Sequence, residues 1–296
     1  MLRRRYLVVV PVLVAWASGS AHAVVICARK DANGAFREGA ALHLRAACKV
    51  SEAPLPVSFE DGGQTVRFTG VNVQIVNGAG ESNDVNGRGN LIVGYNEDDV
   101  PPLDRSGSHN LVLGQGNSYT SYGGLVGGIE NTISGPESVA FGFDNEASGQ
   151  HAFVLGGFLN TASGIGAVVA GGESNTASAT SSVASGGQQN IANGFRAWVG
   201  GGGQNHASGS SASVAGGVNN TASGTGTSIV GGAANVASGT NAAVSGGFLN
   251  QAIGDFASIG GGRSNQVTGA NATVSGGTGV AQSTADGWAA GTFSSP

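Results

Sequence analysis

An asparagine recurs at an unbroken interval of fifteen residues through the second half of this chain. The asparagines are Asn145, Asn160, Asn175, Asn190, Asn205, Asn220, Asn235, Asn250 and Asn265. A glycine pair recurs with the same spacing, from Gly156-Gly157 to Gly276-Gly277. Self-similarity at a short fixed period is typical of a solenoid, in which each repeat adds one turn and stacks on its neighbours.

Within each repeat the residues alternate with a period of two, which predicts strands. Counting from the asparagine as position 0, position 2 is Ala in eight of the nine repeats, and position 9 is Val or Ile in all but one. Alternate residues of a strand share a face, so these small residues point inward. We therefore predict an all-β fold, a narrow parallel β-solenoid with two short strands per fifteen-residue turn. Glycine allows the bends between the strands, and the inward asparagines hydrogen-bond from turn to turn.

The outward positions 8 and 10 of the second strand carry an apolar stripe. It consists of Phe153, Leu155, Val168, Val183 and Trp198, and it gives way to serine further along. A contiguous exposed apolar surface marks an interaction site. Because the Ala/Val/Gly interior is thin, we predict that the stripe is buried by self-association into a homo-oligomer. A ligand platform and a face covered by a cap are the alternatives.

The N-terminus has the features of a secretory signal peptide. Three arginines precede a short apolar segment, and Ala21-His22-Ala23 forms a small-x-small cleavage site, so residues 1–23 are predicted to be removed on export. A membrane anchor is the alternative, although the apolar segment is short for a membrane span. In an exported chain the two cysteines, Cys27 and Cys48, are predicted to form a disulfide. The predicted location is secreted or at the cell surface.

The remaining chain is predicted to have four parts. They are a disulfide-containing cap at 24–60, irregular solenoid coils at 61–144 with an inserted loop at 97–106, the regular repeat at 145–280 and a second cap at 281–296. Residues 65–76 alternate in polarity and are expected to form the first solenoid strands. Trp288 and Phe293 are expected to cover the last coil, since terminal repeats must protect their open edge.

The charge of the chain argues against nucleic acid as a partner. Residues 1–23 contain three arginines and no acidic residue, so their removal changes the formal net charge from −5 to −8. A nucleic-acid-binding surface needs a basic stripe. Without one, we expect the chain to bind neither nucleic acid nor an anionic membrane surface.

No residue pattern points to catalysis. The charged side chains after Asn145 are sparse, and His151 and His206 have no Ser or Asp partner at a suggestive spacing. No carboxylate pair, phosphate loop or metal motif is present, so we predict no enzyme activity and no cofactor. The acidic loop of Asn96, Glu97, Asp98, Asp99 and Asp104 contains oxygen ligands of the kind that hard cations prefer. A solvated loop is the simpler interpretation, and no metal site is predicted.

The segment Ser138-Val139-Ala140-Phe141-Gly142 resembles a repeat of the YadA-like heads of trimeric autotransporter adhesins. Ser182-Val183-Ala184-Ser185-Gly186 is a weaker match, and the resemblance covers about 117–280. It implies a left-handed parallel β-roll, a homotrimer, and a head that binds extracellular matrix or cell surfaces, without the stalk and membrane anchor of that family. The repeat here differs in being fifteen residues long.

The segment Asn265-Gln-Val-Thr-Gly also resembles the β-rolls of plant ice-binding proteins. That resemblance implies a rival function, binding to ice or another crystal surface through a flat Thr-rich face. The pattern Thr-x-Ser occurs at Thr161, Thr176 and Thr221 but is interrupted by Ile191, His206, Val236 and Gln251. We therefore predict an adhesin-like surface protein that acts by binding or assembly.

Overall fold

The computed structural model describes residues 25–33, 43–45, 47–54, 57–61, 64–97 and 103–291. Throughout these residues the regular secondary structure is β, and no helix there is long and apolar enough to cross a membrane. The chain divides into two compact units, Met1–Gln74 and Ile75–Pro296. The predicted signal peptide lies outside the described residues.

The first unit contains a small antiparallel sheet closed by a disulfide. Strands β1 (Val25–Arg29), β2 (His43–Arg45) and β3 (Glu52–Pro54) pair in the order β2-β1-β3. The buried Cys27 in β1 is bonded to Cys48, twenty-one residues later, which confirms the predicted pairing. In the loop-entropy description, such a bridge stabilises a unit of this kind by about 3 kcal/mol. That this unit caps the first coil stays a prediction.

The expectation that residues 65–76 form the first solenoid strands is wrong. Only β5 (Thr65–Phe68) is a strand, and it forms an antiparallel hairpin with β4 (Val57–Glu60). The turn between them is supported by Asp61, which has a φ of 51° and accepts a hydrogen bond from the Thr65 hydroxyl at 2.9 Å. Alternation in polarity predicts a strand but does not say with which strand, or in which direction, it pairs.

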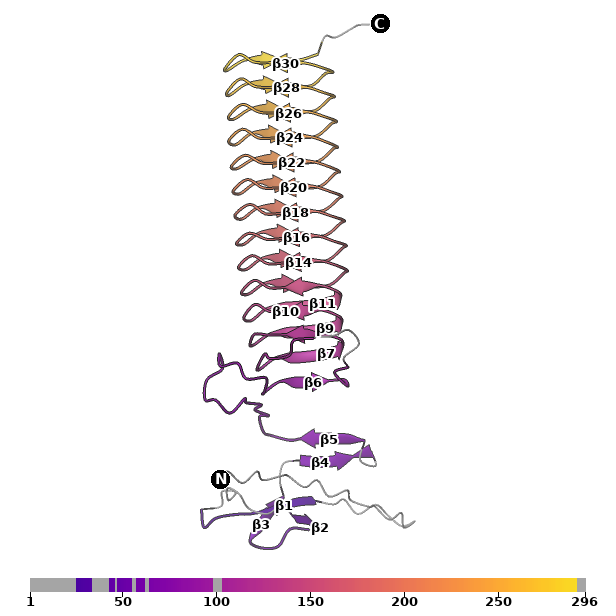
Figure 1. Ribbon diagram of the computed structural model, residues 1–296, viewed down its shortest axis with the longest axis vertical. Coiled ribbons are helices and arrows are strands. Elements are labelled where there is room, and N and C mark those ends of the chain that lie inside the picture. Colours follow the sequence, from indigo (N-terminus) through magenta and orange to yellow (C-terminus); the bar gives the residue numbers. More distant parts are fainter. Residues whose placement is uncertain are drawn as a thin grey trace. The chain divides into compact units, whose positions relative to one another are not determined.

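The second unit is a parallel β-solenoid of about twelve turns, each with two short strands (Figure 1). One sheet has fourteen strands: β6 Leu91–Val93, β7 Leu111–Gln115, β9 Leu125–Ile129, β11 Val139–Phe143, β13 Phe153–Val154, β15 Val168–Val169, β17 Val183–Ala184, β19 Trp198–Val199, β21 Ser213–Val214, β23 Ser228–Ile229, β25 Ala243–Val244, β27 Ser258–Ile259, β29 Thr273–Val274 and β31 Trp288–Ala289. The other has twelve: β8 Ser118–Tyr119, β10 Thr132–Ile133, β12 Glu146–Ala147, β14 Thr161–Ala162, β16 Thr176–Ala177, β18 Ile191–Ala192, β20 His206–Ala207, β22 Thr221–Ala222, β24 Val236–Ala237, β26 Gln251–Ala252, β28 Gln266–Val267 and β30 Ala281–Gln282. The predicted fold class is confirmed.

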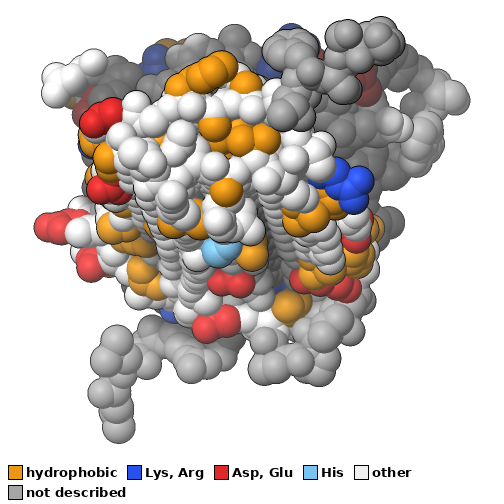
Figure 2. Space-filling model, turned by 90° about the horizontal axis from the view of Figure 1, so that it is seen from above, with side chains coloured by type: hydrophobic (Ala, Val, Ile, Leu, Met, Phe, Trp, Pro, Cys, Tyr) orange, Lys and Arg blue, Asp and Glu red, His pale blue; other side chains and the backbone are white. Residues whose placement is uncertain are grey.

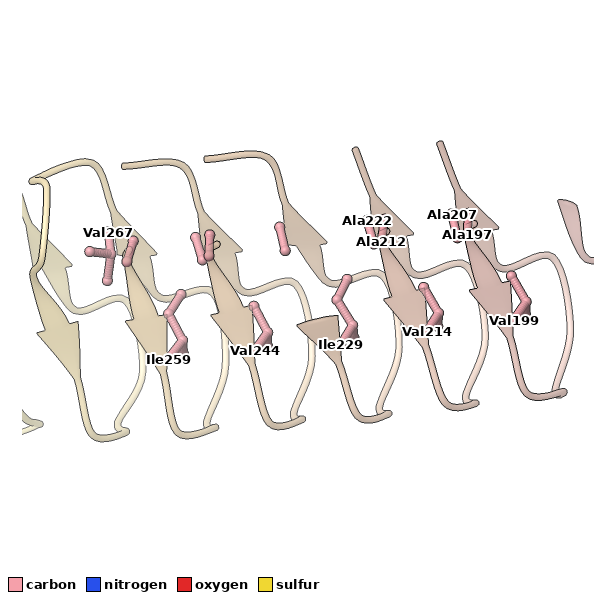
Figure 3. Packing of buried hydrophobic residues seen from close by; sticks show 14 of the residues in the cluster. Ala197, Val199, Ala207, Ala212, Val214, Ala222, Ile229, Val244, Ile259 and Val267 are labelled. Carbon is pink, nitrogen blue, oxygen red and sulfur yellow. The ribbon is translucent and has the colours of Figure 1, made fainter. Parts of the chain in front are cut away.

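The core consists of two facing files of small apolar side chains, one from each sheet. Position 9 of one turn lies directly over position 9 of the turn before, as in Val199↔Val214, and position 2 does the same, as in Ala207↔Ala222. These residues are all fully buried. In Figure 3 the Val and Ile side chains of one sheet form a row that faces the Ala side chains of the other. The two strands of a turn can approach closely because the side chains between them are small.

Position 12 must be glycine for two separate reasons. Gly217 has a φ of 89°, and a Cβ there would collide with the carbonyl oxygen of Gly232 in the next turn. Its neighbour Gly216, at position 11, has open space where a Cβ would lie. Other bends use residues with side chains in the left-handed conformation, such as Leu159 and Arg196, both with a φ of 55°. The left-handed conformation by itself therefore does not require glycine at these bends.

The solenoid continues one turn beyond its predicted end, which corrects the expected role of Trp288. That residue lies in β31, paired in register with Thr273, and is 68% exposed at position 8. It therefore does not cover the end of the core; Phe293 lies outside the described residues. In this last turn Val280 takes the place of asparagine, and its backbone N–H donates to Asn265 Oδ1 at 2.9 Å. The file of asparagines thus ends with a side chain that needs no partner above it.

Candidate functional site on the outer faces of the solenoid

The stacked asparagines form a continuous buried hydrogen-bond ladder. Asn160 donates from Nδ2 to the carbonyl oxygens of Gly156, at the bend just before it (3.1 Å), and of Gly172, at the same bend one turn further along (2.9 Å). Its Oδ1 accepts the backbone N–H of Asn175 at 2.9 Å. Each amide therefore satisfies the bend of its own turn and joins it to the next turn. The ladder is built into the core, so its role is structural.

The predicted apolar stripe lies on the outside of the fourteen-stranded sheet. Phe153, Val168, Val183 and Trp198 occupy consecutive strands in direct register at position 8. Val168 and Val183 are half-buried by their neighbours, whereas Phe153 is 36% exposed. Leu155 lies on the same side, two residues further along its turn, and is 55% exposed. The structure therefore brings all five predicted residues onto one face.

The same apolar column continues toward the N-terminus, where sequence reasoning did not find it. Its upstream members, each in register with the next strand, are Leu91, Leu111, Leu125 and Val139. A second column beside it contains Val93, Leu113, Gly127 and Phe141. A Cβ at Gly127 would meet the Phe141 ring at 2.7 Å, so this glycine gives the ring room on the sheet. We call the outward residues of both columns from Leu91 to Val183 the apolar face.

Trp198 ends the apolar column and lies against the sheet. Its Nε1 donates to Ser185 Oγ, one turn earlier, at 3.0 Å. Its ring covers Gly200, where a Cβ would lie only 2.7 Å from Cζ2. Trp288, six turns later in the same column, donates in the same way to Ser275 Oγ at 2.7 Å. The ninety residues between the two tryptophans are six periods of fifteen, a relationship that the expected capping role of Trp288 did not take into account.

The twelve-stranded sheet presents the Thr-x-Ser positions on its outer side. Thr161 and Thr176 are in direct register, and the next strands place Ile191 and His206 in the same column before Thr221. The His206 imidazole Nε2 lies 2.9 Å from Asn193 Oδ1, so this position carries a bulky ring instead of a hydroxyl. Val236 and Gln251 follow in the column. The threonine array is therefore interrupted on the sheet as well as in the sequence.

The titratable groups are few and do not converge. One close pair joins His151 Nε2, on the first regular turn, to Glu137, one turn earlier, at 2.5 Å, with both side chains about half exposed. Because Glu137 precedes the first regular repeat, the count from Asn145 missed this partner. In the view from above in Figure 2, charged side chains are sparse among uncharged ones.

The positively charged side chain of Arg105 holds the acidic loop in place. The Arg105 guanidinium donates to the carbonyl oxygens of Asn96 at 2.7 Å and Glu97 at 2.6 Å. Hydrogen bonds from Ser106, first from its side chain and then from its backbone, lower the pKa of the exposed Asp104 carboxyl below its ordinary value. Asp98 and Asp99 lie outside the described residues. Within the described residues no group of three His, Cys, Asp or Glu side chains is placed to hold a metal ion.

No family model matches this chain, and no match was found among the curated proteins with which it was compared. The geometry of the outer faces therefore has to carry the functional argument. Two surfaces stand out on the fourteen-stranded sheet, the apolar face from Leu91 to Val183 and the stretch between the two tryptophans.

Proposed function

We propose that this chain is exported and acts as an adhesin-like β-solenoid that self-associates and binds through its surface, without catalysing a reaction. The observation that carries this proposal is the apolar face, because a solvated sheet surface does not need two adjoining columns of Leu, Val and Phe. The core supports it as well. Each turn buries only small side chains, so the interior of one chain contributes little stability. Burial of apolar surface between chains adds to it.

The size of the apolar face suits an interface with a second copy. Seven strands at a spacing of about 4.8 Å extend over about 30 Å, and strands of up to five residues add a width of about 16 Å. The product is on the order of 500 Å², comparable to the largest apolar patch of an ordinary monomer. A stable interface buries roughly 800 Å² on each partner. The apolar face thus supplies most of one interface, and its polar borders can supply the rest.

A single flat face per chain favours a two-fold pair in which the same residues of both copies meet. In such a pair Phe153 and Leu155 are expected to contribute most, because they are large exposed side chains that lie side by side on the first regular turn of the apolar face. The resemblance to autotransporter heads implies a trimer instead, with the stripe turned toward a shared axis. The dimer and the trimer differ in mass, so a measurement of mass distinguishes them.

Light scattering of the chain beginning at Val24 tests the proposal. We expect a mass of two or three chains, and we expect the double variant Phe153→Ser with Leu155→Ser to be monomeric, β-rich and less heat-stable. Ile191→Ser is the matched control, since Ile191 is an exposed apolar residue on the other sheet. Its mass should equal that of the unaltered protein. A monomer at high micromolar concentration of the unaltered chain would refute self-association.

Export is tested separately, on material recovered from outside the cytoplasm. We expect mass spectrometry to find an N-terminus at Val24 and a bonded Cys27–Cys48 pair. An intact N-terminus at Met1, or two free thiols, would contradict export by cleavage of a signal peptide.

A further inference from the structure

The two tryptophans after residue 23 occupy the same one of the fifteen positions in their turns. Trp198 and Trp288 both lie at position 8 of the fourteen-stranded sheet, and each donates its indole N–H to a serine hydroxyl one turn earlier. Six turns at about 4.8 Å separate them, or about 29 Å. The shared position and the shared hydrogen bond indicate that the two tryptophans have the same role.

The hydrogen bond fixes how each ring is presented. Because Nε1 is occupied by Ser185 or Ser275, a ligand meets the face of the indole and not its N–H group. The Trp198 ring lies against the sheet, with Cζ2 and Cη2 next to Gly200. Trp198 is 40% exposed and Trp288 is 68% exposed. Each side chain is thus an ordered aromatic platform, with little flexibility to lose when a ligand binds.

The surface between the platforms is low, uncharged and rich in hydroxyl groups. Position 8 of the intervening turns is occupied by Ser213, Ser228, Ala243, Ser258 and Thr273. Position 10 alongside contains Ala215, Val230, Ser245, Gly260 and Ser275. Neither column contains a charged side chain from Trp198 to Trp288, so the surface favours an uncharged partner. We call this surface the tryptophan shelf.

We propose that the tryptophan shelf binds a linear, neutral polysaccharide that lies along the solenoid axis, with a sugar ring stacked on each tryptophan. The C–H groups on one face of a sugar ring carry partial positive charge and pack on the negative face of an indole. The serine and threonine hydroxyls between the platforms can donate to and accept from the sugar hydroxyls. A small-residue floor admits a flat chain, whereas an apolar peptide would leave these hydroxyls unpaired. The proposal names a ligand class for the surface-binding role proposed above and rests on it.

Fluorescence titration tests the shelf directly, since Trp198 and Trp288 are the only tryptophans of the chain beginning at Val24. The probes are cellohexaose and maltohexaose as neutral chains, cellotriose as a short chain, and polygalacturonate as an anionic one. We expect at least one neutral hexasaccharide to shift the emission, and cellotriose, which cannot span both platforms, to bind at least tenfold more weakly than cellohexaose if cellohexaose is that ligand. Either Trp198→Ala or Trp288→Ala should weaken binding at least tenfold, as measured by calorimetry.

The matched control is Phe195→Ala, which removes an exposed aromatic side chain outside the shelf. It should bind like the unaltered protein, and circular dichroism should show that every variant keeps its fold. Absence of binding by both neutral hexasaccharides at millimolar concentration would overturn the proposal, as would tighter binding of polygalacturonate or unchanged affinity in both tryptophan variants. The mass from light scattering is independent of these results, so failure of the shelf and failure of self-association are distinguishable.

Discussion

Asn160 Oδ1 accepts the backbone N–H of Asn175 at 2.9 Å, and the same bond joins every consecutive pair of asparagines from Asn145 to Asn265. Here a buried side-chain amide makes hydrogen bonds of the kind that a backbone peptide group makes. It pairs with backbone groups at a bend and adds to the backbone bonds between turns there, such as the one from the Phe158 N–H to the Gly172 carbonyl at 3.0 Å. Because each bond joins adjacent turns, the ladder also fixes their register.

Replacement of an asparagine in the middle of the ladder should be severely destabilising. Asn205→Ala removes the side-chain partners of the Gly201 carbonyl and of the Asn220 N–H, and it removes one of the two donors to the Gly217 carbonyl, which keeps the Gly203 N–H. Each unsatisfied buried group costs about 1–3 kcal/mol, so for two such groups we expect a loss of about 2–6 kcal/mol in the free energy of unfolding, measured with denaturant. The exposed Asn193→Ser, which installs the residue common at that position, is the control. A loss below about 1 kcal/mol for Asn205→Ala would contradict the structural role of the ladder.

The two glycines of a pair should respond differently to the same substitution. Gly217→Ala places a side chain in the left-handed region and against the Gly232 carbonyl, and the backbone strain alone costs about 1–3 kcal/mol. Gly216→Ala meets nothing within 4 Å, so its effect should stay within about 1 kcal/mol. Thermal unfolding of the two variants measures the difference. Equal melting temperatures would show that position 12 tolerates a side chain.

The Asp104 carboxyl should titrate below its ordinary pKa in the folded protein. Because the Ser106 hydrogen bonds favour the charged form, its contribution to stability is present above the ordinary aspartate pKa and is lost as the pH falls through the lowered pKa. Ser106→Ala should raise the pKa toward its ordinary value, since the side-chain bond is the larger cause. NMR titration of the carboxyl carbon measures both. An unchanged pKa in the variant would assign the effect to the backbone bond.

The chain should show no thermal hysteresis and no inhibition of ice recrystallisation. An ice-binding face needs a regular hydroxyl array, and Ile191 and His206 interrupt it between Thr176 and Thr221. Measurement of the freezing point at micromolar protein tests this expectation. Detectable hysteresis would make crystal-surface binding the leading function.

Much of the solenoid could be predicted because the same residue types recur at fixed positions of every repeat. Position 9 and position 2 repeat as Val and Ala, and alternation alone then gives two strands and a thin core. The upstream part of the apolar face was missed because Leu91 and Leu111 are separated by twenty residues, with the inserted loop between them. Counting in fifteens therefore does not place them in one column.

The role of Trp288 was hidden for a different reason. The last turn has Val280 in place of asparagine and Gln282 in place of alanine, so the sequence loses its signature while the backbone continues the same path. The hairpin of β4 and β5 was missed because strand alternation does not reveal the partner. In each case local residues specified a strand, and long-range pairing decided its neighbour.

The strand pairing also determines how the solenoid responds to a pulling force. Each strand bonds only to the turn before and the turn after it, and those bonds run along the axis. A force that separates the two ends therefore detaches turns from an end one after another, and the load is never shared by the whole sheet. Each detached turn releases about 50 Å of extended chain from about 5 Å of stacked length. If the two ends of such a solenoid were held, it would unfold turn by turn under tension and lengthen about tenfold before the chain was fully extended.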